Sequence, residues 1–253
     1  MERLERIASA AMGRSMHVWR FGHWGRPVLV LPSAAGTAHE WYEGGLIDAL
    51  RGLIERGNIK LYCTESNVAE SWADFEGHPE MRVARHAAFE RYVLDELVPW
   101  IDADCQTPDI PIALAGASLG ALYAATLALK HPERFRYALC LSGRYDAAWL
   151  TDGFTNTEVH YNNPMAFVPH LDGAELERVR RSVHLDLVCG RGAFEGSNLR
   201  ATIEFGAVLE HKRISHRREL WGREAAHDPR WWSQQAVHYL GQRFGQSQRQ
   251  SLA

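Results

Sequence analysis

The sequence has few cysteines, little net charge and no long apolar run, and each of these absences excludes a class of protein. Its 253 residues include four cysteines, Cys63, Cys105, Cys140 and Cys189, without the paired spacing of a zinc or redox site. We therefore expect buried free thiols and a reducing, cytoplasmic location. With 28 Lys and Arg against 31 Asp and Glu, the formal charge is −3. This balance gives no electrostatic reason to expect nucleic acid or an anionic membrane as a partner.

Targeting, membrane-spanning and metal-binding patterns are missing as well. The first residues mix charges into the chain and lack the apolar core of a signal peptide. No apolar run approaches the roughly 20 residues that a bilayer span needs. The 13 histidines form neither an HExxH motif nor paired spacing with cysteine. We expect a protein with no membrane span and no metal or other cofactor.

What the sequence does contain is a regular alternation of short apolar runs and helix-length segments. The runs predict strands at 16–21, 27–31, 60–63, 111–115, 136–141, 183–189 and 217–221. The intervening segments predict helices at 46–56, 84–101, 119–130, 199–211 and 229–244. Strands that alternate with helices over the whole length indicate an α/β fold with a mostly parallel central sheet and helices on both faces.

Finer features of this organisation can also be predicted. The first two strands, 16–21 and 27–31, flank a short turn and suggest an antiparallel hairpin. Segment 144–181 is rich in turn signals and is interpreted as an insertion over the strand ends. No repeat or break in composition marks a second domain, so we expect one domain over 1–253 with a polar, frayed tail at 245–253.

One motif carries chemistry: Gly116-Ala-Ser118-Leu119-Gly120, of the form G-x-S-x-G, between a buried strand and a helix. At such a turn the glycines allow close backbone approach, and the serine hydroxyl is exposed above the sheet at a helix N-terminus. Ser118 is the candidate nucleophile, and the N–H of Leu119 is a candidate oxyanion donor. The alternatives are a tight turn with a structural serine, or a phosphate-binding loop, which no GxGxxG or Gly-Lys-Ser/Thr sequence supports.

A nucleophilic serine needs a base, and in α/β-hydrolases the chain order is serine, acid, histidine. His227 follows the last predicted strand and precedes the last helix, where the base is expected. His184 begins a strand, and His211 and His216 lie at the wrong end of the last one. The alternative for His227 is a surface histidine beside Asp228, the expected helix cap.

The acid is expected in the loop after strand 183–189. Glu195 is the best candidate, because it is the only carboxylate in that loop. Glu204 lies inside the following helix, Asp186 lies inside the strand, and Asp228 adjoins the base. The alternative for Glu195 is a solvated loop carboxylate.

A second oxyanion donor is expected from the loop 32–37, which follows the second predicted strand. Ala34 or Ala35 is the candidate, since small residues let backbone N–H groups crowd the site. The alternative is a plain tight turn. Trp41 and Trp149 are candidates for an acyl pocket, although tryptophans are usually buried in the core.

Four segments together resemble the esterase branch of the α/β-hydrolases, which includes esterase D (S-formylglutathione hydrolase), the enterochelin esterases and the mycolyltransferases. They are Gly-Ala-Ser118-Leu-Gly, His131-Pro132-Glu-Arg-Phe, Leu141-Ser-Gly-Arg-Tyr-Asp146 and Ala226-His227-Asp228-Pro-Arg-Trp-Trp. The resemblance covers roughly residues 15–245. It implies the α/β-hydrolase fold and a triad of Ser118, Glu195 and His227. Relatives often carry an aspartate in a G-x-x-D arrangement where this chain reads Gly190-Arg-Gly-Ala-Phe-Glu195.

We therefore expect a serine carboxylic-ester hydrolase acting on a small-molecule or acyl ester. His227 takes the proton of Ser118, Ser118 attacks the ester carbonyl, and water hydrolyses the acyl-enzyme. Two other interpretations stay open: an acyltransferase with the same triad, and a non-catalytic binding protein on a hydrolase scaffold. The latter would need neither Ser118 nor His227. The sequence leaves open the acyl and alcohol groups of the substrate and whether the chain forms a homo-oligomer.

Overall fold

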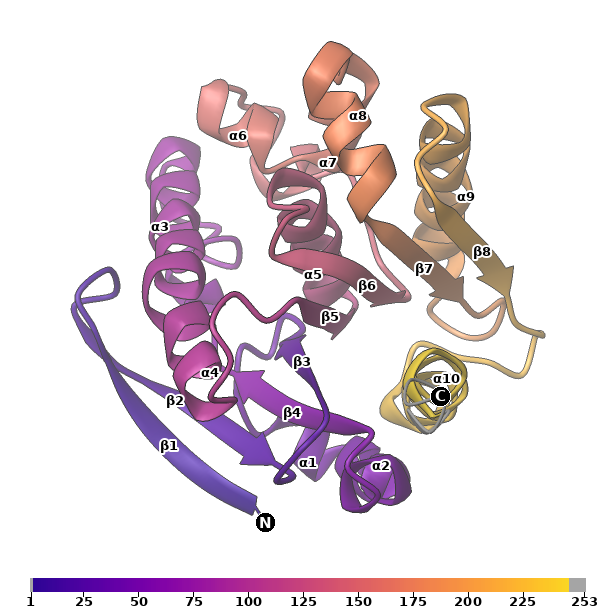
Figure 1. Ribbon diagram of the computed structural model, residues 1–253. Coiled ribbons are helices and arrows are strands. Elements are labelled where there is room, and N and C mark those ends of the chain that lie inside the picture. Colours follow the sequence, from indigo (N-terminus) through magenta and orange to yellow (C-terminus); the bar gives the residue numbers. More distant parts are fainter. Residues whose placement is uncertain (1, 246–253) are drawn as a thin grey trace.

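The computed structural model describes residues 2–245, and its centre is an eight-stranded sheet with helices on both faces (Figure 1). The strands are β1 (Glu2–Ser9), β2 (Arg14–Phe21), β3 (Arg26–Leu31), β4 (Ile59–Thr64), β5 (Ile112–Ala117), β6 (Phe135–Leu141), β7 (His184–Cys189) and β8 (His216–Leu220). Their order in the sheet is β1-β2-β4-β3-β5-β6-β7-β8.

The helices fill the connections between these strands. They are α1 (Glu40–Glu43), α2 (Leu46–Glu55), α3 (Pro79–Arg91), α4 (Val98–Asp104), α5 (Leu119–Lys130), α6 (Thr157–Tyr161), α7 (Pro164–Phe167), α8 (Gly173–Ser182), α9 (Gly196–His211) and α10 (Pro229–Phe244). Shorter helical turns are η1 (Val68–Glu70), the π-helical η2 (Tyr92–Leu97) that joins α3 to α4, η3 (Ala148–Leu150) and η4 (Val168–His170).

The predicted α/β fold is confirmed. From β4 to β8 every neighbouring pair of strands is parallel, and only β1 and β2 join the sheet in antiparallel fashion. Strands β4 and β5 are buried at every position, as expected for parallel strands with helices on both faces. Helices α5 and α10 begin and end at the predicted residues.

The predicted hairpin of 16–21 with 27–31 is wrong. Strand β2 pairs with β1 and β4, and β4 separates it from β3. Strand β3 is apolar after its first residue and buried there, so it needs a partner on each edge, and it pairs in parallel with β4 and β5. The true hairpin partner, β1, went unpredicted because its charged and largely exposed sequence suits only the edge of a sheet.

The segment predicted as an insertion, 144–181, connects β6 to β7. It contains η3, α6, α7, η4 and most of α8, the helix that leads into β7. The predicted tail, 245–253, lies outside the described residues except for Gly245.

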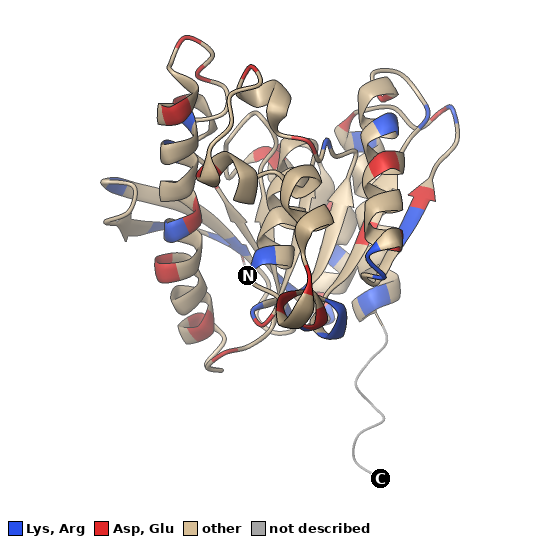
Figure 2. Cartoon of the chain, turned by 90° about the horizontal axis from the view of Figure 1, so that it is seen from above, with Lys and Arg blue, Asp and Glu red and all other residues tan. Residues whose placement is uncertain are grey.

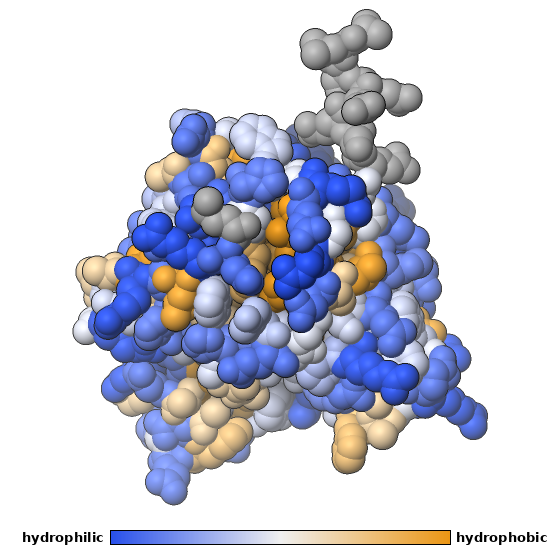
Figure 3. Space-filling model, turned by 90° about the horizontal axis from the view of Figure 1, so that it is seen from below, coloured by the Kyte–Doolittle hydropathy of each residue, from blue (hydrophilic) through white to orange (hydrophobic). Residues whose placement is uncertain are grey.

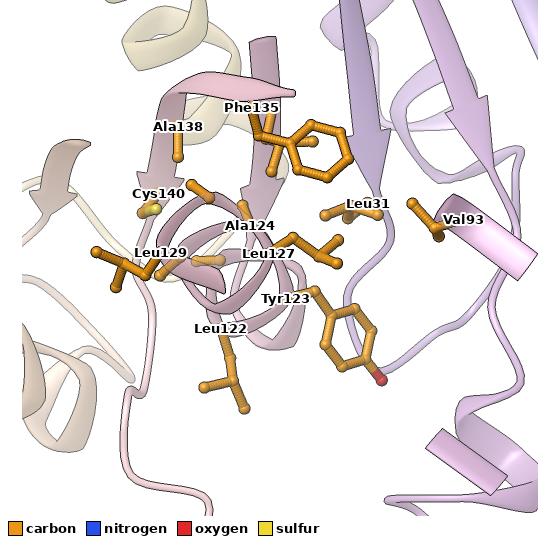
Figure 4. Close-up of a cluster of buried hydrophobic side chains, with 14 of the residues drawn as sticks. Leu31, Val93, Leu122, Tyr123, Ala124, Leu127, Leu129, Phe135, Ala138 and Cys140 are labelled. Atoms are coloured by element: carbon orange, nitrogen blue, oxygen red, sulfur yellow. The ribbon is translucent and has the colours of Figure 1, made fainter. Parts of the chain in front are cut away.

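Two apolar clusters hold the helices against the sheet. Helices α1, α2 and α10 cover one face, which lies below the sheet in Figure 1, and α3, α5, α8 and α9 cover the other. Every residue of α5 from Leu119 to Leu129 is buried. Its side chains meet Leu31, Val93 and Phe135 around it (Figure 4). The start of α5, which follows Ser118, is therefore anchored in the core.

The outer surface is mostly hydrophilic. Seen from above, residues of both charges are spread over the outer helices and strands (Figure 2). Seen from below, apolar side chains show between hydrophilic ones (Figure 3). Within residues 2–245, no helix combines the length and the apolar character that crossing a membrane would require.

Candidate active site

The candidate residues meet at the carboxyl edge of the sheet. Ser118 directly follows β5, Glu195 lies in the loop after β7, and His227 lies between β8 and α10. The chain leaves β3 for β4 on one side and returns to β5 on the other, which opens a crevice between the ends of β3 and β5. Parallel topology thus brings together side chains that are far apart in the sequence.

Ser118 occupies a sharp, strained turn. Its backbone has φ 54° and ψ −117°, a region that residues other than glycine adopt only when their surroundings enforce it. A Cβ on Gly116 would clash with the backbone of Gly120, and one on Gly120 would clash with the carbonyl oxygen of Leu31. The N–H of Ser118 donates to the carbonyl of Leu141 at 2.8 Å. The two glycines therefore permit the close strand–helix approach that this turn requires.

Ser118 and His227 face the same cavity, which has a volume of about 370 Å³. The other lining residues are Ala34, Val68, Trp72, Ala73, Phe75, Leu119, Arg144, Trp149, Leu150, Ser197 and Asn198. Trp149 is thus at the cavity, as the sequence suggested. Trp41 is not, because it is 1% exposed and packs in the core beside α2 and α10.

The imidazole of His227 is held from several sides. Its Nδ1 lies 3.2 Å from Oε2 of Glu195, and its ring packs edge-to-face on Trp232 with 4.9 Å between centroids. Its backbone N–H donates to the carbonyl of Ala193 at 3.0 Å. With Nδ1 turned to the carboxylate, Nε2 is the nitrogen left free to exchange a proton at the cavity.

Glu195 is buried, with 1% of the residue exposed, and its carboxylate is well supplied with donors. Oε1 accepts from the hydroxyl of Ser142 and, at 3.4 Å, from the N–H of Gly190. Oε2 accepts from the Asn198 amide at 3.2 Å and faces His227. Burial acts to raise the pKa of Glu195, but the bonds from His227, Ser142 and Asn198 and the charge of His227 outweigh it and lower the pKa. The carboxylate therefore stays ionised at neutral pH.

Sequence reasoning missed the residues that surround this carboxylate. Ser142 follows β6 and also accepts a hydrogen bond from Nε1–H of Trp232 at 3.1 Å. The amide nitrogen of Asn198 lies 2.8 Å from Nδ1 of His227 as well as bonding to Glu195. The position of Ser142 at a strand end beside β5 could have indicated it. Trp232 ends one of the segments that carry the family resemblance, whereas nothing in the sequence points to Asn198.

The loop after β3 distinguishes Ala34 from Ala35, the two candidates for the second oxyanion donor. Ala34 lines the cavity, whereas Ala35 does not, and the N–H of Ala35 donates to Oγ of Ser33 at 3.3 Å. Ser33 in turn donates its N–H and hydroxyl to Glu40, at 2.9 and 3.0 Å. Burial raises the pKa of Glu40, and the two bonds from Ser33 oppose that shift. This geometry favours Ala34, which lines the cavity together with Leu119.

The carboxylates that the sequence argument set aside have other contacts. Asp186 accepts from the guanidinium of Arg217 at 2.7 and 2.9 Å and from His184 at 3.2 Å. Asp228 caps α10 by accepting from the N–H of Trp231 at 3.2 Å. In the described part of the chain, no group of three or more His, Cys, Asp or Glu side chains is placed to hold a metal ion.

Comparison with known proteins now decides the family. The model of a family described as "Putative esterase" matches residues 52–251, more than half of the chain. The chain belongs to this esterase family. By family it is a serine esterase, as the resemblance in the sequence implied.

Solved structures share the fold of this esterase. A ferulic acid esterase covers 97% of the chain and 98% of its own length, with a TM-score of 0.74 and 17% identity. An S-formylglutathione hydrolase from Agrobacterium tumefaciens covers 97% and 96%, with a TM-score of 0.74 and 16% identity. The enterobactin esterase of Shigella flexneri is 20% identical and covers 96% of the chain and 60% of its own, with a TM-score of 0.64. No curated protein matches.

Proposed function

We propose that this esterase hydrolyses carboxylic esters of small molecules through an acyl-enzyme on Ser118. One observation carries the proposal: Ser118 and His227 line the same cavity, and a buried carboxylate, Glu195, binds the far side of the His227 ring. A nucleophile beside a base, and an acid that orients the base from its other side, constitute the machinery of serine hydrolases.

Each residue has a defined task. Nε2 of His227 takes the proton of the Ser118 hydroxyl as Oγ attacks the ester carbonyl. The N–H groups of Leu119 and Ala34 donate to the oxyanion that forms. His227 then protonates the leaving alcohol, and afterwards activates the water that releases the acid from Ser118.

Glu195 keeps the proton of His227 on Nδ1, so that Nε2 is available as the base, and it stabilises the imidazolium that forms. Ser142 and Asn198 donate to the carboxylate and hold its orientation. The reaction as proposed needs no cofactor. All four cysteines are free, which fits the reducing, cytoplasmic setting that we propose for the enzyme.

A fluorophosphonate probe and 4-nitrophenyl acetate test the proposal. We expect the probe to label the peptide that contains Ser118, and the ester to be turned over steadily. Ser118→Ala and His227→Ala should each lower kcat by about 10³-fold or more, as loss of a nucleophile or base does. The control is Ser233→Ala, a half-buried serine of α10 that does not line the cavity.

Labelling at Ser142 or Ser197 instead of Ser118 would show that the nucleophile is wrongly assigned. A protein inert toward both reagents would favour a binding function on a hydrolase scaffold.

A further inference from the structure

The candidate active site contains one permanently charged side chain that the proposed mechanism does not use. Arg144 follows β6 by three residues and lines the cavity together with Ser118 and His227. The cavity walls beside it are apolar and include Trp72, Phe75 and Leu150. An unpaired guanidinium that faces a cavity with apolar walls is available to bind an anionic group of a ligand.

Within residues 2–245, Arg144 forms no ion pair, and its main contact is with an aromatic ring. Its guanidinium carbon lies 4.1 Å from the ring centroid of Trp149, and among the described residues no carboxylate comes within ion-pair distance of it. The nearest acid in sequence, Asp146, accepts from the N–H of Ala148 at 2.9 Å and from the amide of Asn163 at 2.7 Å. Partial burial lowers the pKa of Arg144, and the nearby charge of Asp146 opposes that shift without cancelling it, yet an arginine remains charged.

The wall that carries Arg144 and Trp149 is braced from behind. Arg82 of α3 is 1% exposed, donates to the carbonyl of Leu150 at 2.8 Å and pairs with Asp152 at 2.7 Å. The segment that follows Arg144 and Trp149 in the cavity wall is therefore tied to α3.

We propose that Arg144 binds a carboxylate of the substrate, so that this enzyme prefers esters that carry an anionic group close to the scissile bond. A guanidinium offers a planar fork of N–H donors that matches a carboxylate. The stacking on Trp149 leaves the edge of the fork for that anion, while the hydrocarbon part of the substrate packs on the apolar walls. This inference rests on the proposed function and specifies its substrate class.

Two matched pairs of esters test it, one for each side of the ester bond. Monomethyl glutarate and methyl pentanoate differ by a carboxylate on the acyl side. O-Acetylglycolate and ethyl acetate differ by a carboxylate on the alcohol side. The measured quantity is the ratio of kcat/KM for the anionic ester to that for its neutral partner, from titration of the acid released.

We expect the wild-type protein to favour the anionic member of at least one pair. In Arg144→Gln the ratio for that pair should fall about ten- to hundredfold, the loss typical of hydrogen bonds to a charged group. Arg144→Lys should give an intermediate ratio, because it keeps the charge and loses the fork. Arg200→Gln is the matched control, since Arg200 is exposed on α9 and does not line the cavity.

A binding measurement separates this inference from the catalytic proposal. Calorimetric titration of glutarate into Ser118→Ala should show one site that disappears in Ser118→Ala, Arg144→Gln. An unchanged ratio in Arg144→Gln, which an equal loss on both members of each pair would also give, would overturn the role of Arg144. Absence of glutarate binding to Ser118→Ala would overturn it as well if the acyl-side pair is the one that shows the preference. If no ester is hydrolysed and Ser118 is not labelled, the proposed function fails, while the glutarate titration still decides whether Arg144 binds an anion.

Discussion

Replacement of Glu195 by glutamine tests the catalytic geometry most directly. The side chain is nearly isosteric, so the packing around it should survive. In Glu195→Gln, however, an amide NH2 group replaces one carboxylate oxygen, and hydrogen-bond donors surround the positions of both oxygens. Ser142 and Gly190 donate to Oε1, while His227 and Asn198 lie against Oε2.

Whichever way the new amide turns, one of its N–H groups faces a donor. If that donor is Nδ1–H of His227, the imidazole can relieve the conflict by moving its proton to Nε2. That tautomer cannot accept the proton of Ser118, and the analogous change in a serine protease triad lowers kcat about 10⁴-fold. We expect a loss of roughly 10²–10⁴ in kcat. KM should change little, because Glu195 does not line the cavity.

The same substitution should change the dependence of stability on pH. The pKa of Glu195 in the folded protein lies below its ordinary value of 4.5, so the folded state binds fewer protons than the unfolded state in this range. The stabilisation is therefore complete above the unfolded pKa and is lost as the pH falls through the folded pKa. The difference in Tm between wild type and Glu195→Gln should shrink as the pH is lowered from 7 toward that range.

The assay is steady-state hydrolysis of 4-nitrophenyl acetate, with Tm from circular dichroism. Glu204→Gln is the control, since Glu204 is exposed on α9. A Glu195→Gln protein that keeps kcat within about threefold of wild type would refute the reasoning. If Asp228→Asn instead removes activity at unchanged Tm, Asp228 is the acid. If it lowers Tm as well, the loss reflects the helix cap that Asp228 provides.

Three further predictions concern the scaffold. Gly120→Ala should abolish activity and destabilise the fold by about 1–3 kcal/mol, because the new Cβ clashes with the backbone. Gly241→Ala has open space around its Cβ position and should stabilise the fold by up to about 1 kcal/mol. Calorimetry and ester turnover compare the two variants, and equal effects would count against a strained turn at Ser118. Arg82→Met should raise KM severalfold by releasing the cavity wall at Leu150, and an unchanged KM would contradict this. Hydrogen bonds from His131 and Lys130 outweigh the effect of burial and lower the pKa of Glu90 to about 2. Glu90→Gln should therefore lower the free energy of unfolding by up to about 3 kcal/mol at pH 7. Urea titrations should show this loss of stability vanishing as the pH falls from 4.5 toward 2.

Local pattern was enough for most elements and for the turn that contains the candidate nucleophile. Helix α5 is apolar throughout, and strands β4 and β5 are short runs bounded by turns, so their type follows from composition and length alone. The G-x-S-x-G turn is equally local, because the clash that excludes a side chain at Gly116 arises within five residues of it. The positions of Glu195 and His227 required one more premise, that the carboxyl ends of parallel strands meet at one edge of the sheet.

Only the tertiary structure decided which strands pair and which way the side chains point. Which strands pair depends on the whole sheet, and for this reason the predicted hairpin of 16–21 with 27–31 was wrong and β1 was missed. The donors to Glu195 come from three separate elements, and Ala34 and Ala35 are equivalent until the loop is folded. Arg144 shows the same division: its charge is evident from the sequence, but whether a guanidinium faces a carboxylate, water or an apolar cavity is settled by packing among distant segments, which no local pattern encodes.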